Sequence, residues 1–168
     1  MSILSELEGR RSIRKYKNKA IEQDKLLKVL EAARLSPSAR NRQSWRFIVV
    51  KDSKVRERLT EAIGQAFVGE APVIMVSCGT EADGIMKCGQ PRYTIDLSIA
   101  TSYMILEAYK QGLGTCWLGS FDENMVKEVL NIPQEVRVVA ITPLGYPDES
   151  PSQRPRKELE EITSYDKY

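Results

Sequence analysis

The residues with the clearest capacity for chemistry are arginines near both ends of the chain. The segment Arg10-Arg11-Ser12-Ile13-Arg14-Lys15-Tyr16 holds three arginines and a serine hydroxyl. Guanidinium groups match phosphate oxygens in pairs, so this composition could bind a phosphate. The alternative is a solvated basic segment, which is the commoner meaning of a charge run taken alone. The tail segment Arg154-Pro155-Arg156-Lys157 has the same two interpretations.

Two further segments could bind a flat, polar ligand. The segment Ser36-Pro37-Ser38-Ala39-Arg40-Asn41-Arg42-Gln43-Ser44 holds hydroxyls and carboxamides that both donate and accept hydrogen bonds, which suits the edge of a heteroaromatic ring. Its alternative is a plain turn before a core Trp45. The segment Gly112-Leu113-Gly114-Thr115-Cys116-Trp117-Leu118-Gly119-Ser120 has glycines that would let a ligand approach the backbone. Its alternative is a helix stop followed by a tight strand.

The chain contains no histidine, and this absence excludes several kinds of site. Ser-His-Asp and Cys-His nucleophile systems and His-ligated zinc or iron all need that residue. The cysteines Cys78, Cys88 and Cys116 form no CxxC and lack the spacing of a zinc or iron–sulfur site. If the protein is an enzyme, we therefore expect a bound organic cofactor to carry the reaction. The alternative is a Lys, Tyr, Asp or Glu that acts alone.

Length and charge restrict the class of protein further. The 168 residues predict a single domain, 1–168, with 145–168 as a C-terminal arm because that stretch is rich in proline and charge. A net charge of +2 argues against a protein that coats nucleic acid or an anionic membrane. Residues 1–14 are too polar for a signal peptide, and the odd cysteine count fits a reducing compartment. The default expectation is a cytoplasmic location.

The elements that must position these segments follow from apolar periodicity and caps. Helices are expected at 22–35, at 94–111 with Gly112 after its end, after a cap at Asp52 or Ser53, and after a cap at Asp122. A short first helix would be capped by Ser2. Strands are expected at 47–50, 73–76, 115–118 and 136–142. This alternation favours a parallel, doubly wound sheet, although the glycines are not spaced as a GxGxxG dinucleotide motif.

In this order and spacing, the segments RRSIRKY, SPSARNRQSW, GLGTCWLG and RPRK resemble the nitroreductase family over residues 10 to about 162. The resemblance implies an α+β sandwich with a mixed, mostly antiparallel sheet flanked by helices, contrary to the parallel interpretation. It also implies an intertwined homodimer with two FMN sites at the interface. The reaction would transfer hydride from NADH or NADPH, through flavin N5, to a small-molecule acceptor such as a nitroaromatic, a quinone or dioxygen.

The resemblance also assigns site residues. Arg10 and Ser12 would hold the FMN phosphate with Arg11 nearby, and Arg14 would approach the pyrimidine side of the ring. The phosphate site would be closed by Arg154 and Arg156. The other subunit would supply Pro37, Ser38, Asn41 and Gln43, and a backbone N–H near N5 would come from Leu118, Gly119 and Ser120. No catalytic side chain and no metal ligand is expected.

Alternatives remain at this stage. The same fold could carry a specialised flavin reductase, dehalogenase or ene-reductase, or a flavin-binding protein without turnover. A basic nucleic-acid-binding module is a third class. The stretch 79–92 leaves little room for a helical excursion that could shape an acceptor pocket, so the acceptor stays open.

Overall fold

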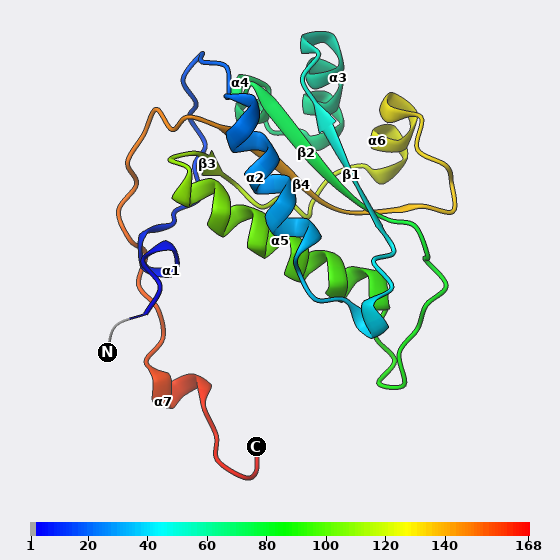
Figure 1. Ribbon diagram of the computed structural model, residues 1–168, viewed down its shortest axis with the longest axis vertical. Coiled ribbons are helices and arrows are strands. Elements are labelled where there is room, and N and C mark those ends of the chain that lie inside the picture. Colours follow the sequence, from blue (N-terminus) through cyan, green and yellow to red (C-terminus); the bar gives the residue numbers. More distant parts are fainter. Residues whose placement is uncertain (1–2) are drawn as a thin grey trace.

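A four-stranded antiparallel sheet forms the centre of the computed structural model, which describes residues 3–168. Its strands are β1 (Trp45–Val50), β2 (Val73–Gly79), β3 (Gly114–Thr115) and β4 (Arg137–Gly145), in the spatial order β1-β2-β4-β3 (Figure 1). All three neighbouring pairs are antiparallel. The α+β class expected from the resemblance is confirmed.

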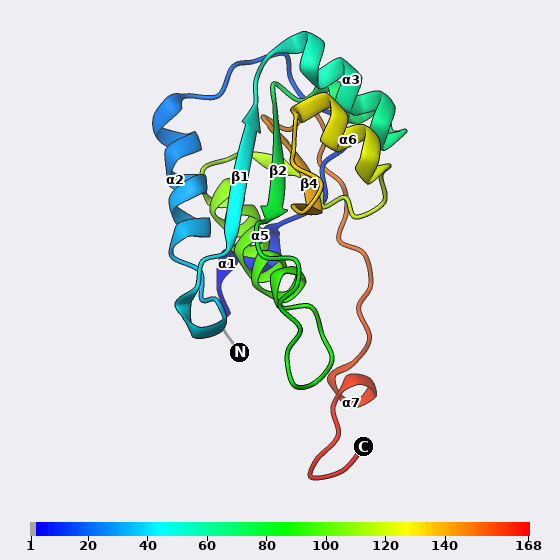
Figure 2. The same cartoon turned by 90° about the vertical axis from the view of Figure 1, so that its right-hand side faces the viewer.

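Helices cover both faces of the sheet. The helical elements are α1 (Ser5–Gly9), α2 (Gln23–Arg34), a 3-10 turn (Ala39–Asn41), α3 (Ser53–Ile63), α4 (Phe67–Glu70), α5 (Arg92–Lys110), α6 (Glu123–Leu130) and α7 (Leu159–Ile162). Figure 2 shows α2 on one side of the sheet and α3 and α6 on the other. The short α7 lies away from the helix and sheet layers, near the C-terminus (Figures 1 and 2).

The alternation of side chains along β2 explains why both faces need cover. Ile74, Val76 and Cys78 point into a buried cluster with α3, α4 and α6. Val73 and Met75 point the other way, into a second cluster with α2 and α5. Successive side chains of a strand face opposite sides of the sheet, and helices cover both sides. Every residue of β2 is therefore buried. The sheet therefore presents an apolar surface to each helical layer.

The parallel sheet favoured by the alternation of strands and helices is wrong. Val50, the last residue of β1, pairs with Ile74 near the start of β2. A parallel arrangement needs a crossover that returns the chain to the starting end of the first strand. Here α3 and the short α4 bring the chain into β2 at the end where β1 stops, so the two strands run in opposite directions.

Several local predictions are confirmed. The Asp52 carboxylate accepts hydrogen bonds from the backbone N–H groups of Lys54 and Val55, each at 3.0 Å, and so caps α3. Asp122 caps α6 in the same way through the N–H of Met125. Gly112 follows α5 with a φ of 74°, which glycine adopts without strain. The predicted cap at Ser2 lies outside the described residues.

Within residues 3–168, no helix has the length and apolar character needed to cross a bilayer.

Gly114 is the point where the N-terminal segment packs against β3, and substituting it tests this packing. A Cβ at this position would lie 2.7 Å from Cγ1 and 2.8 Å from Cβ of Ile13. We expect Gly114→Ala to lower the free energy of unfolding by about 1–3 kcal/mol because the core must shift to accept the methyl group. Gly119→Ala is the control, because its Cβ would meet only Trp117 Nε1 at 3.7 Å. Urea denaturation curves that coincide for Gly114→Ala and the native chain would contradict the packing.

Candidate functional site

The N-terminal segment is fixed along the edge of the sheet by backbone contacts with β3 and by the buried side chains of Ile13 and Tyr16. The N–H of Ile13 donates to the carbonyl of Thr115 at 2.8 Å, and Ser12 forms a parallel bridge with the same residue. The buried Tyr16 hydroxyl donates to the carbonyl of Ile13 at 2.7 Å, and burial raises the pKa of this phenol. With Ile13 and Tyr16 inside, the intervening Arg14 is exposed.

The C-terminal segment returns to this same place. Pro147 bridges Tyr16, and the N–H of Asp148 donates to the carbonyl of Lys15 at 2.9 Å. The Glu149 carboxylate accepts a hydrogen bond from the backbone N–H of Arg14. These contacts place the residues that follow β4 beside the residues that follow α1, although more than a hundred positions separate them in the sequence.

A pocket of about 160 Å³ lies where the two segments meet. It is lined by Arg10, Arg11, Ser12, Arg14, Pro151, Ser152, Gln153, Arg154 and Arg156. The structure thus brings together all the residues that were assigned to a phosphate from the two ends of the chain. That a phosphate binds there is not tested by the geometry and stays a prediction.

The five arginines of this pocket form no ion pair with an acid among the described residues. Within residues 3–168, every ion pair joins other residues. The guanidinium of Arg11 donates from Nη1 to the carbonyls of Glu8 at 2.6 Å and Arg10 at 2.9 Å, which fixes its position without neutralising it. Five guanidinium groups around one small pocket repel one another, and an anion with several oxygens would offset that repulsion.

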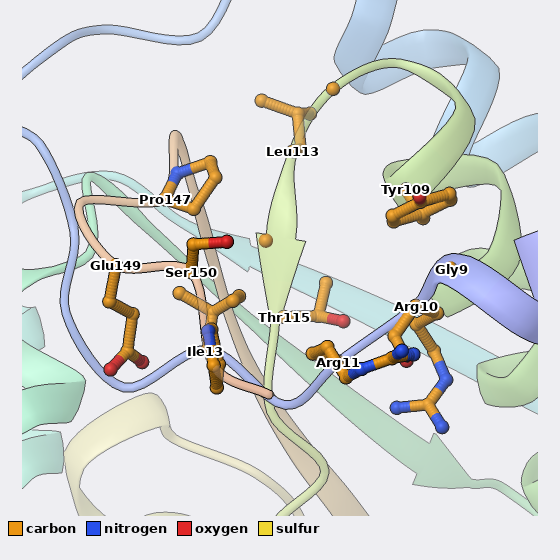
Figure 3. A pocket seen from close by; sticks show the side chains of 13 residues that line it. Gly9, Arg10, Arg11, Ile13, Tyr109, Leu113, Thr115, Pro147, Glu149 and Ser150 are labelled. Atoms are coloured by element: carbon orange, nitrogen blue, oxygen red, sulfur yellow. The ribbon is translucent and has the colours of Figure 1, made fainter. Parts of the chain in front are cut away.

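A second pocket of about 330 Å³ adjoins the first and shares Arg10, Arg11 and Pro151 with it. Figure 3 shows Arg10 and Arg11 beside Thr115, with Glu149 on the opposite side of Ile13. Tyr109, near the end of α5, and Leu113 line it as well. Tyr109 and Glu149 were not predicted to be part of the site, because neither carries a local sequence signal that separates it from an ordinary surface residue.

The predicted ring-contacting segment continues from β3. Leu118 exchanges backbone hydrogen bonds with Ile141 of β4 at 2.9 and 3.0 Å, and its side chain is buried. Gly119 and Ser120 are exposed. Trp117, directly before them, lines a cavity of about 350 Å³ together with Arg10 and Ser12. The backbone of residues 118–120, which was expected near the flavin ring, therefore directly follows Trp117, a residue that shares a cavity with Arg10 and Ser12.

The structure places the predicted loop residues away from the arginine-lined pocket of the same chain. They are Pro37, Ser38, Asn41 and Gln43. The loop is held to the start of α5, where the N–H of Ala39 donates to Asp96 Oδ1 at 3.0 Å. The arginine region lies near the other end of this helix, at Tyr109. At 1.5 Å per residue, about 20 Å of helix separates Asp96 from Tyr109. One chain does not bring these four residues to the arginines.

The thiols of the core are poorly suited to act as nucleophiles. Cys116 is buried near Ser12 and Arg14, and burial raises the pKa of its thiol more than these neighbours lower it. Burial raises the pKa of Cys78 to about 11. Because both pKa values are raised, the two thiols are largely protonated at neutral pH. The thiolate is the reactive form of cysteine, so neither group is a good nucleophile. Across residues 3–168, no group of three or more His, Cys, Asp or Glu side chains is placed to hold a metal ion.

The helix-covered antiparallel sheet and the arginine-lined pocket define an α+β protein with a cationic pocket between its two chain ends. Comparison with known proteins identifies the family. The family model described as nitroreductase family matches residues 7–73 and 61–146. The chain belongs to the nitroreductase family.

Relatives support this assignment at several levels. A Methanothermobacter thermautotrophicus protein named as an NADH dehydrogenase/NAD(P)H nitroreductase is 35% identical over 159 residues, which cover 92% of this chain and 82% of that one. An iodotyrosine deiodinase from Thermotoga neapolitana is 27% identical over 176 residues, with 89% and 91% covered.

Solved structures give the same result. A nitroreductase family protein from Clostridium novyi NT has a TM-score of 0.83 at 37% identity, covering 92% of this chain and 89% of that one. An FMN-dependent nitroreductase from Clostridium difficile R20291 has a TM-score of 0.85 at 29% identity, with 99% and 100% covered.

Proposed function

We propose that this chain is an FMN-dependent NAD(P)H oxidoreductase whose flavin phosphate binds in the arginine-lined pocket. The observation that carries the proposal is the set of five guanidinium groups, contributed by both chain ends, without acidic partners among the described residues. A phosphate monoester dianion is opposite in charge to this pocket, and the Ser12 hydroxyl adds a further donor. The donor set therefore fits the phosphate end of FMN.

In this proposal the residues of the chain bind the two ends of FMN separately. Arg10, Ser12, Arg154 and Arg156 bind and orient the phosphate, while Arg14 provides positive charge toward the ring. Gly119 and Ser120 are exposed, and their backbone N–H groups would donate to a flat ligand. When bound, FMN supplies the redox chemistry, accepting hydride from NADH or NADPH and passing electrons to an acceptor. No protein side chain is required as an acid or a nucleophile.

The site is proposed to be shared between two chains of a homodimer. The loop with Ser38, Asn41 and Gln43 lies at the opposite end of α5 from the arginines of its own chain. Exposed apolar side chains offer a surface for a second copy, among them Leu4 directly before α1, Leu7 on α1 and Tyr103 on α5. In such a dimer the loop of one chain would complete the site of the other. We propose that residues 1–168 form one domain, with 145–168 as an arm toward the partner.

The acceptor is proposed as a small oxidised molecule, with nitroaromatics, quinones and dioxygen as candidates. Reductive dehalogenation is the second candidate, and the similarity to the iodotyrosine deiodinase favours it. Three free cysteines suit a cytoplasmic location, which we include in the proposal.

The test is a spectrum of the purified protein with FMN, recorded before and after anaerobic addition of NADH or NADPH. We expect flavin absorbance that bleaches with the nucleotide and returns with a nitroaromatic or with air. Absorbance that returns only with an iodinated phenol would support dehalogenation. A protein that binds FMN without bleaching would be a flavin-binding protein without turnover. A protein that does not bind FMN would contradict the proposal.

The cysteines provide a second prediction. A variant with Cys78→Ser, Cys88→Ser and Cys116→Ser is expected to retain FMN and to oxidise NAD(P)H within about threefold of the native rate. The buried thiols of Cys78 and Cys116 contribute little nucleophilicity because they are protonated, and Cys88 lines none of the pockets at the arginine region. The measurement is steady-state NAD(P)H oxidation at a known flavin content. Since two of these cysteines are buried, thermal unfolding curves serve as the folding control. Loss of turnover with flavin still bound would reveal a thiol-dependent step.

A further inference from the structure

The loop after α2 has an unusual backbone for its residue types. Arg40, Asn41 and Gln43 have φ values of 54°, 53° and 53°, and none of them is glycine. Side-chain-bearing residues are disfavoured in this left-handed region. The loop is also exposed from Arg40 to Gln43, so burial of apolar surface does not hold it in place. Polar contacts must therefore maintain its conformation.

Some of these contacts lie within the loop. The Ser38 hydroxyl accepts from the N–H of Gln43 at 3.1 Å, and the Ser38 carbonyl accepts from the N–H of Asn41 at 2.9 Å. The Gln43 carboxamide donates to the Asn41 carbonyl at 3.3 Å. These bonds fix the loop's internal shape, but they do not fix its place on the molecule.

Asp96 provides an anchor outside the loop. This residue of α5 is only 6% exposed, and Oδ1 of its carboxylate accepts from the N–H of Ala39 at 3.0 Å. Within residues 3–168 this is the one hydrogen bond that its side chain makes. Burial of a carboxylate is costly unless it is compensated. One hydrogen bond to a loop therefore does not explain, in terms of stability alone, why an acid occupies this buried position.

A second tether joins the other end of the loop to the start of α5. The Glu81 carboxylate accepts from Arg42 at 3.2 Å and from Arg92 at 2.7 Å. Arg92 is the first residue of α5. Both ends of the exposed loop are thus tied to the first two turns of one helix, directly through Asp96 and indirectly through Arg92.

We propose that Asp96 is a positioning residue that holds the Ser38–Gln43 loop in the conformation in which it contacts FMN. This inference rests on the proposed function. Asp96 does not touch the ligand in this proposal; it acts through the N–H of Ala39. Ligand affinity falls in proportion to the fraction of loops in the competent conformation, so loss of the anchor would weaken FMN binding without altering the phosphate pocket.

The experiment compares Asp96→Leu with Asp96→Asn in the full-length chain. Leucine has a similar branched shape and cannot accept a hydrogen bond, whereas asparagine keeps an acceptor oxygen. We expect Asp96→Leu to raise the FMN dissociation constant by about tenfold to a hundredfold, the range for a hydrogen bond to a charged group. Asp96→Asn should recover binding to within about fivefold of the native chain, because neutral hydrogen bonds are weaker than charge-assisted ones. The measurement is the quenching of FMN fluorescence.

Inorganic phosphate separates positioning from general damage. Phosphate should compete with FMN at the arginine pocket with the same inhibition constant in the native chain and both variants. Circular dichroism and thermal unfolding should show that Asp96→Leu is folded. Equal FMN affinity in Asp96→Leu and the native chain would overturn the inference while leaving the proposed function intact. Parallel losses of phosphate and FMN binding would also overturn it, because they indicate a merely structural role. A native chain that binds no FMN would instead refute the proposed function.

Discussion

A chain that ends at Glu149 is expected to bind FMN at least about a hundredfold more weakly than the full chain, because two arginine contacts are lost and each contributes roughly 1.5–3 kcal/mol. The missing residues supply one side of the arginine-lined pocket, including Arg154 and Arg156. Residues 152–168 are exposed, and the contacts of Pro147 and Asp148 with the N-terminal segment remain. The truncated chain should therefore still fold.

Single substitutions refine this expectation. Arg154→Ala and Arg156→Ala should each weaken FMN binding by about ten- to a hundredfold at the same magnitude per contact. Lys167→Ala is a matched control, since it removes a cation from the same arm outside the pocket. It should leave the dissociation constant within about twofold, because an isolated exposed charge contributes little. Fluorescence titration measures all four proteins.

Two outcomes of this experiment would count against the assignment. Unchanged FMN affinity after truncation would remove the arm from the site. If Lys167→Ala were as damaging as Arg154→Ala, the arm would act through general positive charge and not through a defined pocket. Sedimentation of the truncated chain is needed as well, because the arm could also contribute to dimer stability.

The local elements could be predicted from sequence because their signals are local. Asp52 and Asp122 satisfy free N–H groups at helix starts, and Gly112 adopts a backbone angle that suits glycine. The short helices α4 and α7 have four residues each and were not predicted. A single helical turn cannot show the period of 3.6 residues on which such predictions depend.

Sheet topology was not accessible in the same way. The order of strands and helices favoured a parallel sheet, whereas the structure pairs Val50 with Ile74 in antiparallel fashion. The expected strand at 115–118 also proved shorter, with β3 ending at Thr115 and Leu118 forming a separate bridge to Ile141. Both differences depend on how the chain turns between elements, which residue periodicity does not encode.

The candidate site combines short-range and long-range information. The arginines and Ser12 were noticed from residue type alone. Their meeting with Arg154 and Arg156 was implied only by the family resemblance, since sequence spacing does not indicate that two chain ends lie together. The left-handed backbone of Arg40, Asn41 and Gln43 was not predicted, because none of them is glycine and asparagine alone tolerates that region well. Asp96 resembles any helical acid until its burial is known.

A mixed dimer is expected to recover FMN binding that both of its parent variants have lost. One parent carries Arg154→Ala and Arg156→Ala. The other carries Asn41→Gly and Gln43→Gly, where glycine removes the side chains and still accepts the positive φ of both positions. Each homodimer should bind FMN poorly, because every site lacks either the phosphate contacts or the loop contacts.

The recovery follows from two-fold symmetry. If each site takes its arginines from one chain and its loop from the other, the mixed dimer contains one site with both defects and one with none. Co-expression with two different tags and purification on both would isolate it. We expect about one FMN per mixed dimer with native affinity, against about two per native dimer. If a single chain supplied the whole site, both sites of the mixed dimer would stay defective and no native-affinity FMN would bind. That result would contradict the shared site, whereas a native chain that sediments as a folded monomer would contradict the dimer itself.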